Sequence, residues 1–70
     1  MQIHVFITNL SDSKRISDAG ASLDVHPHIF EWNVDMHDVD NVLRVVSSNI
    51  EAKEIQELVL NAGYYCEELQ

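Results

Sequence analysis

The order in which apolar patterns follow one another along the chain limits its fold more than any other feature. Residues 3–8 alternate with the two-residue period of a strand, and residues 29–34 and 42–46 are rich in aromatic and β-branched side chains. Residues 11–23 and 55–62 instead repeat apolar side chains at the spacing of a helix. The pattern predicts the order strand, helix, strand, strand, helix.

Turn and capping residues mark where these elements begin and end. Pro27 forbids continuation of a helix and places a loop over residues 24–28, and Gly63 provides the left-handed conformation that ends the second helix. A last short strand is predicted over residues 64–69. Ser11 is the predicted N-cap of the first helix, and the capping residues predicted before the second helix are Ser47, Ser48 and Asn49.

Together these elements predict a ferredoxin-like fold of the α+β class with the order βαββαβ. Two right-handed crossovers around a central hairpin give a four-stranded antiparallel sheet with two helices on one face. A chain of 70 residues is about the lower limit for independent folding, so residues 1–70 are expected to form a single domain. The side chains expected to face the helices are Ile3, Val5, Ile7, Leu10, Ile16, Leu23, Trp32, Val34, Leu43, Val45, Ile55, Val59 and Ala62.

The other face of the predicted sheet is expected to be open to solvent. Phe6, Val42 and Val46 are predicted to share this face and to form a small apolar patch, a feature that often marks an interaction site. We expect the patch to serve a protein partner or weak self-association, so that the chain is a monomer or a weak homodimer.

The charge of the chain argues against two classes of partner. Twelve acidic residues against four basic ones give a formal net charge of -8, which repels phosphate backbones and anionic lipid headgroups. Nucleic acid and membrane surfaces are therefore not expected as partners. The N-terminus has no basic region, and no apolar run approaches the ~20 residues of a membrane span, so a cytoplasmic location is expected.

Five short stretches carry a resemblance to a known family through their order and spacing. They are Thr8-Asn9-Leu10, Trp32-Asn33-Val34-Asp35, Val42-Leu43-Arg44-Val45, Ala52-Lys53-Glu54-Ile55 and Ala62-Gly63-Tyr64. In register, they resemble heavy-metal-associated domains of the copper-chaperone type over nearly the whole chain. The resemblance implies the same ferredoxin-like fold and a role in metal homeostasis.

The same resemblance shows where the chain departs from the family. Such domains carry Cys-x-x-Cys on the loop from the first strand into the first helix, and aligning Leu10 with the family's apolar position puts Asp12 and Arg15 where the cysteines belong. Soft ions such as Cu(I) need paired thiolates, which a carboxylate and a guanidinium do not replace. We expect Asp12 and Arg15 to form a surface ion pair or to complement the charge of the helix N-terminus, and we expect neither a metal at this loop nor another cofactor.

Cys66 is the single cysteine of the chain, so it cannot close an intrachain disulfide. Because a free cysteine packs as a small hydrophobe, it is expected to be a buried structural thiol.

Two histidines leave an alternative metal function open. His26 and His28 flank Pro27, and on an extended segment this spacing would place both rings on the same side. A third ligand for a borderline divalent ion such as Zn, Ni or Cu(II) would come from Glu31, His4 or Asp24. The other candidate group, Asp35, His37, Asp38 and Asp40, lacks the spacing of a calcium loop and is expected to be a solvated acidic loop.

Enzymatic function is not expected. Acylphosphatases share this strand order, but they need a glycine-rich anion-binding loop after the first strand, and Asp12 in the corresponding loop would repel phosphate. No spacing pairs a serine or cysteine nucleophile with a histidine base. The sequence therefore predicts a small binding or interaction module with a degenerate soft-metal site, or alternatively a borderline-metal carrier using His26 and His28.

Overall fold

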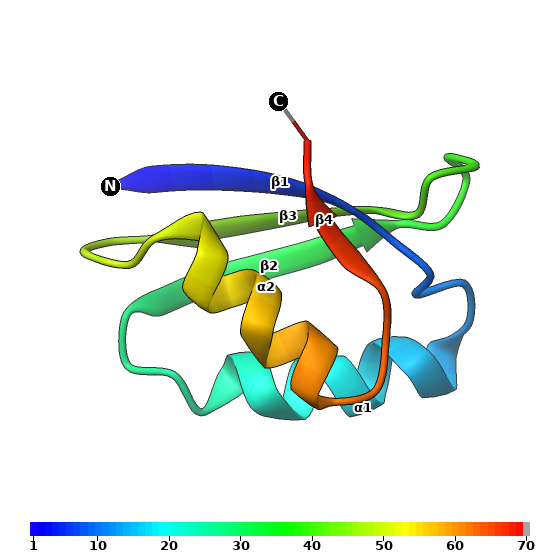
Figure 1. Ribbon diagram of the computed structural model, residues 1–70, viewed down its shortest axis with the longest axis horizontal. Coiled ribbons are helices and arrows are strands. Elements are labelled where there is room, and N and C mark those ends of the chain that lie inside the picture. Colours follow the sequence, from blue (N-terminus) through cyan, green and yellow to red (C-terminus); the bar gives the residue numbers. More distant parts are fainter. Residues whose placement is uncertain (70) are drawn as a thin grey trace.

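Two helices pack on one face of a four-stranded antiparallel sheet in the computed structural model, which describes residues 1–69 (Figure 1). The strand order across the sheet is β2-β3-β1-β4, with β1 paired to both β3 and β4. This arrangement confirms the predicted ferredoxin-like βαββαβ fold. The elements are β1 (Gln2–Thr8), α1 (Ser13–Asp24), β2 (Ile29–Asp35), β3 (Val42–Ser47), α2 (Ala52–Asn61) and β4 (Cys66–Glu68).

The N-cap of helix α1 lies one residue later in the sequence than predicted. Asp12, not Ser11, is the N-cap, and its Oδ1 accepts a hydrogen bond of 2.8 Å from the backbone N–H of Arg15. Serine and aspartate cap helices about equally well, so composition alone does not choose between neighbours. Asp12 has the extended backbone that a cap requires.

Helix α2 has no side-chain cap, which corrects the second capping prediction. Its N-cap is Glu51, and no side chain there accepts from the helix. Ser47 instead ends β3 as a buried residue, and Asn49 adopts a positive φ of 54° in the turn between β3 and α2. At the other end, Gly63 has a φ of 98°, which confirms its predicted left-handed stop.

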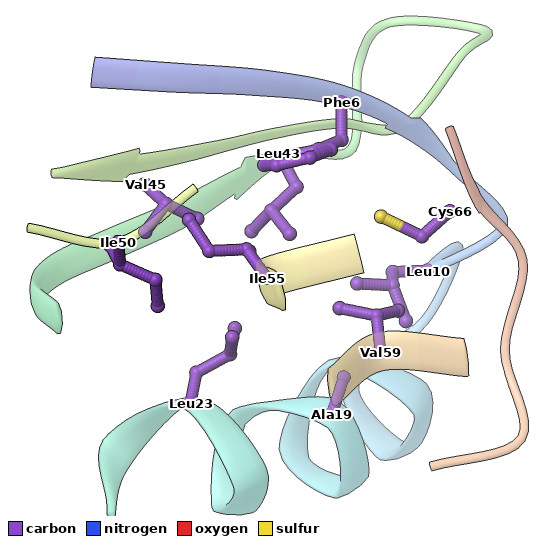
Figure 2. Packing of buried hydrophobic residues seen from close by; sticks show 10 residues of the cluster. All are labelled: Phe6, Leu10, Ala19, Leu23, Leu43, Val45, Ile50, Ile55, Val59 and Cys66. Carbon is purple, nitrogen blue, oxygen red and sulfur yellow. The ribbon is translucent and has the colours of Figure 1, made fainter. Parts of the chain in front are cut away.

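The core lies between the sheet and the helices. In Figure 2, Leu43 and Val45 point from β3 toward the helices, and Leu23 and Ala19 point from α1 toward the sheet. Each large apolar side chain buried in this way contributes about 1.5–3 kcal/mol. The buried cluster consists of Phe6, Leu10, Ala19, Leu23, Leu43, Val45, Ile50, Ile55, Val59 and Cys66.

The predicted facing of β1 is wrong. Phe6 is fully buried beneath the sheet, Thr8 is also buried, and Ile3 is 61% exposed on the opposite face. Because successive side chains of a strand point to opposite faces, Val5 and Ile7 lie outward with Ile3, so Ile55 and Val59 do not face them. The outward face of β1 is simply more apolar than its inward face, and counting apolar residues therefore selects the wrong side.

Hydrogen bonds explain why the inward face of β1 can carry the polar side chains of His4 and Thr8. His4 Nε2 donates to the carbonyl of Ile50 at 3.2 Å, and Thr8 Oγ1 donates to the carbonyl of Asn41 at 2.6 Å. A hydrogen bond removes most of the cost of burying a polar group. Phe6 then supplies the apolar bulk of this face of β1.

Trp32 of β2 closes the core against α1, as predicted from its alternation in the sequence. Its indole Nε1 donates to Asp24 Oδ1 at 2.7 Å, and its ring lies directly over Gly20. The absence of a side chain at Gly20 is what allows this close approach.

Within residues 1–69, no helix is both long and apolar enough to cross a membrane.

Candidate functional site

The loop between β1 and α1 is the position at which the sequence predicts a degenerate metal site. Leu10 anchors the loop as a fully buried side chain, and its backbone N–H donates to Thr8 Oγ1 at 3.1 Å. Thr8 N–H also donates to the carbonyl of Asp40 at 3.0 Å, and Tyr65 N–H donates to Asn9 Oδ1 at 2.9 Å. The loop is therefore tied to the β2–β3 hairpin and to the segment before β4.

Asp12 and Arg15 bond to each other and to the loop itself. Arg15 Nε lies 3.5 Å from Asp12 Oδ2, and Arg15 donates from its guanidinium to the carbonyl of Asn9 at 3.1 Å. The predicted ion pair is thus present, and the carboxylate also caps the helix. Because both partners are substantially exposed, the pair contributes well under about 1 kcal/mol.

A second polar cluster on α1 joins the helix to the segment before β4. Tyr64 donates its hydroxyl hydrogen to Asp18 Oδ2 at 2.6 Å, and Lys14 Nζ lies 3.0 Å from the same oxygen. The hydrogen bond from Tyr64 and then that from Lys14 lower the pKa of Asp18 below its usual value. The same contacts raise the pKa of Tyr64 and of Lys14.

The sequence indicates only part of this cluster. Lys14 and Asp18 are four residues apart on one helix, a spacing that predicts their contact directly. Tyr64 is 46 residues away from Asp18 in the chain, and no local pattern predicts that pairing. Only the tertiary fold, which places the segment between α2 and β4 beside α1, brings the two side chains together.

Cys66 is buried, as predicted, and its side chain points into the core beside Leu10 and Val59 (Figure 2). Burial raises the pKa of the Cys66 thiol to about 12. At neutral pH this sulfur is therefore a protonated thiol, whereas metal ligation requires the thiolate.

His26 and His28 lie in a turn between α1 and β2, not on the extended segment that was predicted. The backbone N–H of His28 donates to His26 Nδ1 at 3.1 Å, and the ring centroids are 5.8 Å apart. The carboxylate beside His26 belongs to Glu54 of α2, whose Oε2 lies 2.8 Å from Nε2. The sequence does not reveal this contact because it joins residues 28 positions apart.

The three side chains predicted as a further ligand have other positions. Asp24 accepts from Trp32, and His4 donates to Ile50 beneath the sheet. Glu31 is paired with Val46 on the opposite face of the sheet. Among the described residues 1–69, no group of three or more histidine, cysteine, aspartate or glutamate side chains has the geometry to hold one metal ion.

The acidic β2–β3 loop is built by its own side chains. Asp35 Oδ1 accepts from the backbone N–H of His37, and Asp38 Oδ1 accepts from that of Asp40, each at 2.9 Å. These short-range bonds are aspartate turns, which shape the hairpin. The residues themselves are exposed to solvent, as predicted.

Of the three residues predicted to share the open sheet face, Val42 and Val46 do so and Phe6 does not. Val42 and Val46 are half-buried on the outward face of β3, where they pair with Asp35 and Glu31. Phe6 belongs to the core, because it pairs with the buried Leu43. The β1 side chains on this face are instead the alternate set that begins with Ile3, which pairs with Val46.

No protein-family model matches the chain, and no curated protein matches its sequence. Solved structures do match. The copper transporter domain Ccc2a from yeast superposes with a TM-score of 0.85 at 18% identity, over 100% of this chain and 97% of that chain. A copper-binding domain of HMA7, a P-type ATPase, gives 0.86 at 19% identity, over 100% and 96%.

A structure of the Atx1–Cu(I)–Ccc2a complex also matches, with a TM-score of 0.84 at 18% identity over 100% of this chain and 97% of that chain. At these identities the likeness concerns the arrangement of the backbone. The chain therefore has the ferredoxin-like fold found in these copper-binding domains.

Proposed function

We propose that this chain is a small, non-catalytic interaction module with the fold of a copper-binding domain and without the soft-metal site. The observation that carries the proposal is the chemistry of the β1–α1 loop. Asp12 and Arg15 occupy the positions that the family resemblance assigns to thiolates, and both are used to hold the loop and to cap α1.

The available donors do not suit Cu(I). Soft ions select thiolate and thioether ligands, whereas the Asp12 carboxylate is a hard donor and the Arg15 guanidinium carries no acceptor. Cys66 is the single cysteine of the chain, and it lies in the core on β4 as a protonated thiol. One such sulfur does not complete a two-sulfur site.

Association with another protein is the function that we assign to this chain. A matching structure is a complex of Ccc2a with Atx1, which gives an example of a domain with this backbone associating with a protein. In the present chain, the formal charge of -8 makes the surface strongly acidic. An acidic surface steers and orients partners of opposite charge.

A competition assay with a Cu(I) chelator tests the loss of the metal site. We expect the wild type not to compete for Cu(I), and the double variant Asp12→Cys with Arg15→Cys to bind it tightly through two sulfurs at the start of α1. Circular dichroism establishes that the variant is folded, since it also loses the cap. Tight binding by the wild type would overturn the proposal, and no gain in a folded double variant would overturn the placement of the loop.

The pairing of His26 with Glu54 supports an alternative, a carrier of a borderline divalent ion. Calorimetry of the wild type with Zn²⁺, Ni²⁺ and Cu²⁺, repeated with His26→Ala and His28→Ala together, separates the two functions. Submicromolar binding that vanishes in the double variant would establish the metal carrier. We expect weak binding that the two substitutions leave nearly unchanged.

A further inference from the structure

The sheet face opposite the helices is unusually apolar for a surface. In antiparallel sheets with one face covered, the other face normally carries polar side chains. Here Ile3 pairs with Val46, and no helix covers this side of the sheet (Figure 1). We call the outward apolar residues of β1 and β3 the sheet patch, and its members are Ile3, Val5, Ile7, Val42 and Val46.

The apolar surface extends past the sheet patch onto the edge strand. A register shift between Ile29 and Glu31 marks a bulge in β2 at Phe30, whose side chain is 59% exposed. Bulges redirect side chains and interrupt strand pairing. Ile3 and Val46 are cross-strand partners, and Phe30 precedes Glu31, the partner of Val46 on the next strand. Exposed apolar side chains such as Ile3 and Phe30 on neighbouring strands often mark an interaction site.

Carboxylates border the sheet patch on both edges of the sheet. Glu31 and Asp35 lie on β2 opposite Val46 and Val42, and Glu67 lies on β4 opposite Ile7. These positions point to the same face as their cross-strand partners. Apolar side chains of β1 and β3, interrupted by Arg44 and bordered by carboxylates, are complementary to a partner with apolar and basic side chains.

A single cation, Arg44, lies among the paired outward positions of β1, β2 and β3. It stands between Asn33 and Val5 in the register, and none of the ion pairs within residues 1–69 involves it. Its three fellow cations, Lys14, Arg15 and Lys53, are on the helices. Within residues 1–69, none of the ion pairs therefore joins Arg44 to the acidic borders of the patch.

A second copy of this chain is a poor occupant of the patch. It would bring an equal net charge of -8 and the same acidic borders to the interface. Like charges placed against each other in an interface are repulsive. A basic partner instead gains from both the apolar area and the carboxylates.

Building on the proposed interaction function, we propose that the sheet patch is the docking surface for a cationic protein segment with apolar side chains. Valine-, isoleucine- or leucine-like side chains cover Ile3, Val46 and Phe30. Lysine or arginine side chains at the margins pair with Glu31, Asp35 and Glu67. Arg44 meets an acceptor of the segment, such as a backbone carbonyl.

Nuclear magnetic resonance titration of the isotope-labelled chain with three synthetic peptides tests this proposal. The first peptide alternates valine and lysine, the second replaces lysine with glutamate, and the third replaces valine with threonine. We expect the first to bind and to shift amide signals of β1 and β3, and the others to bind at least about tenfold more weakly. Equal binding of the second or third peptide would overturn the chemistry proposed for the segment.

Two sets of variants locate the site. Ile3→Ser is expected to weaken binding of the valine–lysine peptide about tenfold, and Glu31→Gln with Asp35→Asn to remove much of its salt dependence. The matched control is Leu60→Ser, which removes an apolar side chain that is 44% exposed on α2 and should leave binding unchanged. All of these positions are exposed, so the variants should retain the fold.

The outcomes separate this proposal from the broader one. Binding that maps to α1 and α2 would overturn docking at the sheet patch and leave the interaction function standing. Concentration-dependent shifts of the sheet signals without peptide would show that a second copy occupies the face, against the proposal. If none of the three peptides binds, docking at the sheet patch is also overturned. The Cu(I) competition result does not depend on any of these peptide outcomes.

Discussion

At Gly20, the indole of Trp32 fills the space that a side chain would need. A Cβ atom built there would lie 2.4 Å from Cζ2 of Trp32 and 2.7 Å from Cη2. In the sequence, the same glycine counts only as a weakness, since it costs a helix about 1 kcal/mol relative to alanine. The contact with Trp32 instead makes glycine the residue that fits at this position.

We expect Gly20→Ala to destabilise the chain by about 1–3 kcal/mol, because the ring or the helix must move. Urea unfolding followed by Trp32 fluorescence measures the change. Ser17→Ala is the control, as it adds helix propensity at an exposed position of the same helix. A Gly20→Ala variant as stable as the wild type would contradict the close contact.

The raised pKa of Cys66 predicts a loss of stability at alkaline pH. The thiol has a pKa of about 12 in the fold and 9.0 as its reference value, so above pH 9 the unfolded chain releases a proton that the folded chain keeps. The free energy of unfolding is unaffected by this group below pH 9. It falls by about 1.4 kcal/mol per pH unit above pH 9 and up to the folded pKa.

Urea unfolding at intervals between pH 8 and about 10 checks this slope, and tyrosine ionisation, with a reference pKa of about 10, contributes mainly at the upper end of this range. Cys66→Ala is the control, and we expect it to flatten the slope between about pH 9 and 10. Tyr64 and Tyr65, whose pKa values are raised by hydrogen bonds to Asp18 and Glu67, add a similar effect only at higher pH. An unchanged slope in Cys66→Ala would contradict the assignment.

At the scale of an element, the start of α1 depends on one carboxylate. We expect Asp12→Ala to cost about 1 kcal/mol of stability, because it removes the acceptor for the backbone N–H of Arg15. Ser11→Ala should be nearly neutral, although serine is an equally good cap by type. Chemical unfolding of the pair measures both, and a larger loss from Ser11→Ala would place the cap one residue earlier.

The elements show which parts of the fold are accessible from sequence. Their order and most of their bounds follow from periodicity, because burying an apolar stripe is the dominant requirement of a strand or helix. The facing of β1 does not follow, since Ile3, Val5 and Ile7 are more apolar than the side that is buried. That choice depends on hydrogen bonds from His4 and Thr8 to carbonyls more than 30 residues away.

The candidate site divides in the same way. The Asp12–Arg15 pair and the buried thiol follow from helix spacing and residue type. The contacts of His26 with Glu54 and of Tyr64 with Asp18 require the tertiary fold, because each joins separate elements. Local spacing therefore predicts the bonds within elements and not the bonds between them.

At the scale of the whole molecule, the excess of negative charge should limit stability. Twelve acidic side chains repel one another, while the exposed pairs of Lys14 with Asp18 and Arg15 with Asp12 contribute little because solvent and salt screen them. We expect the thermal midpoint to rise from low salt to about 1 M sodium chloride, where the screening length is about 3 Å.

The control for this prediction is Glu57→Gln, an exposed position on α2 that reduces the net charge. Its midpoint should respond less to salt than that of the wild type. A midpoint that falls as salt is added would mean that attractive pairs outweigh the general repulsion.

The apolar outward face of β1 also has a consequence for how quickly the chain finds its structure. A shift of one residue in the pairing of this central strand would bury Ile3, Val5 and Ile7 in place of His4, Phe6 and Thr8. Such a misregistered state satisfies the demand for apolar burial and competes with the native state during refolding. We expect stopped-flow refolding to show a slow phase, which reports escape from the misregistered state, and Val5→Thr to reduce the amplitude of this phase. Identical single-exponential kinetics in both proteins would show that the misregistered state is not populated during refolding.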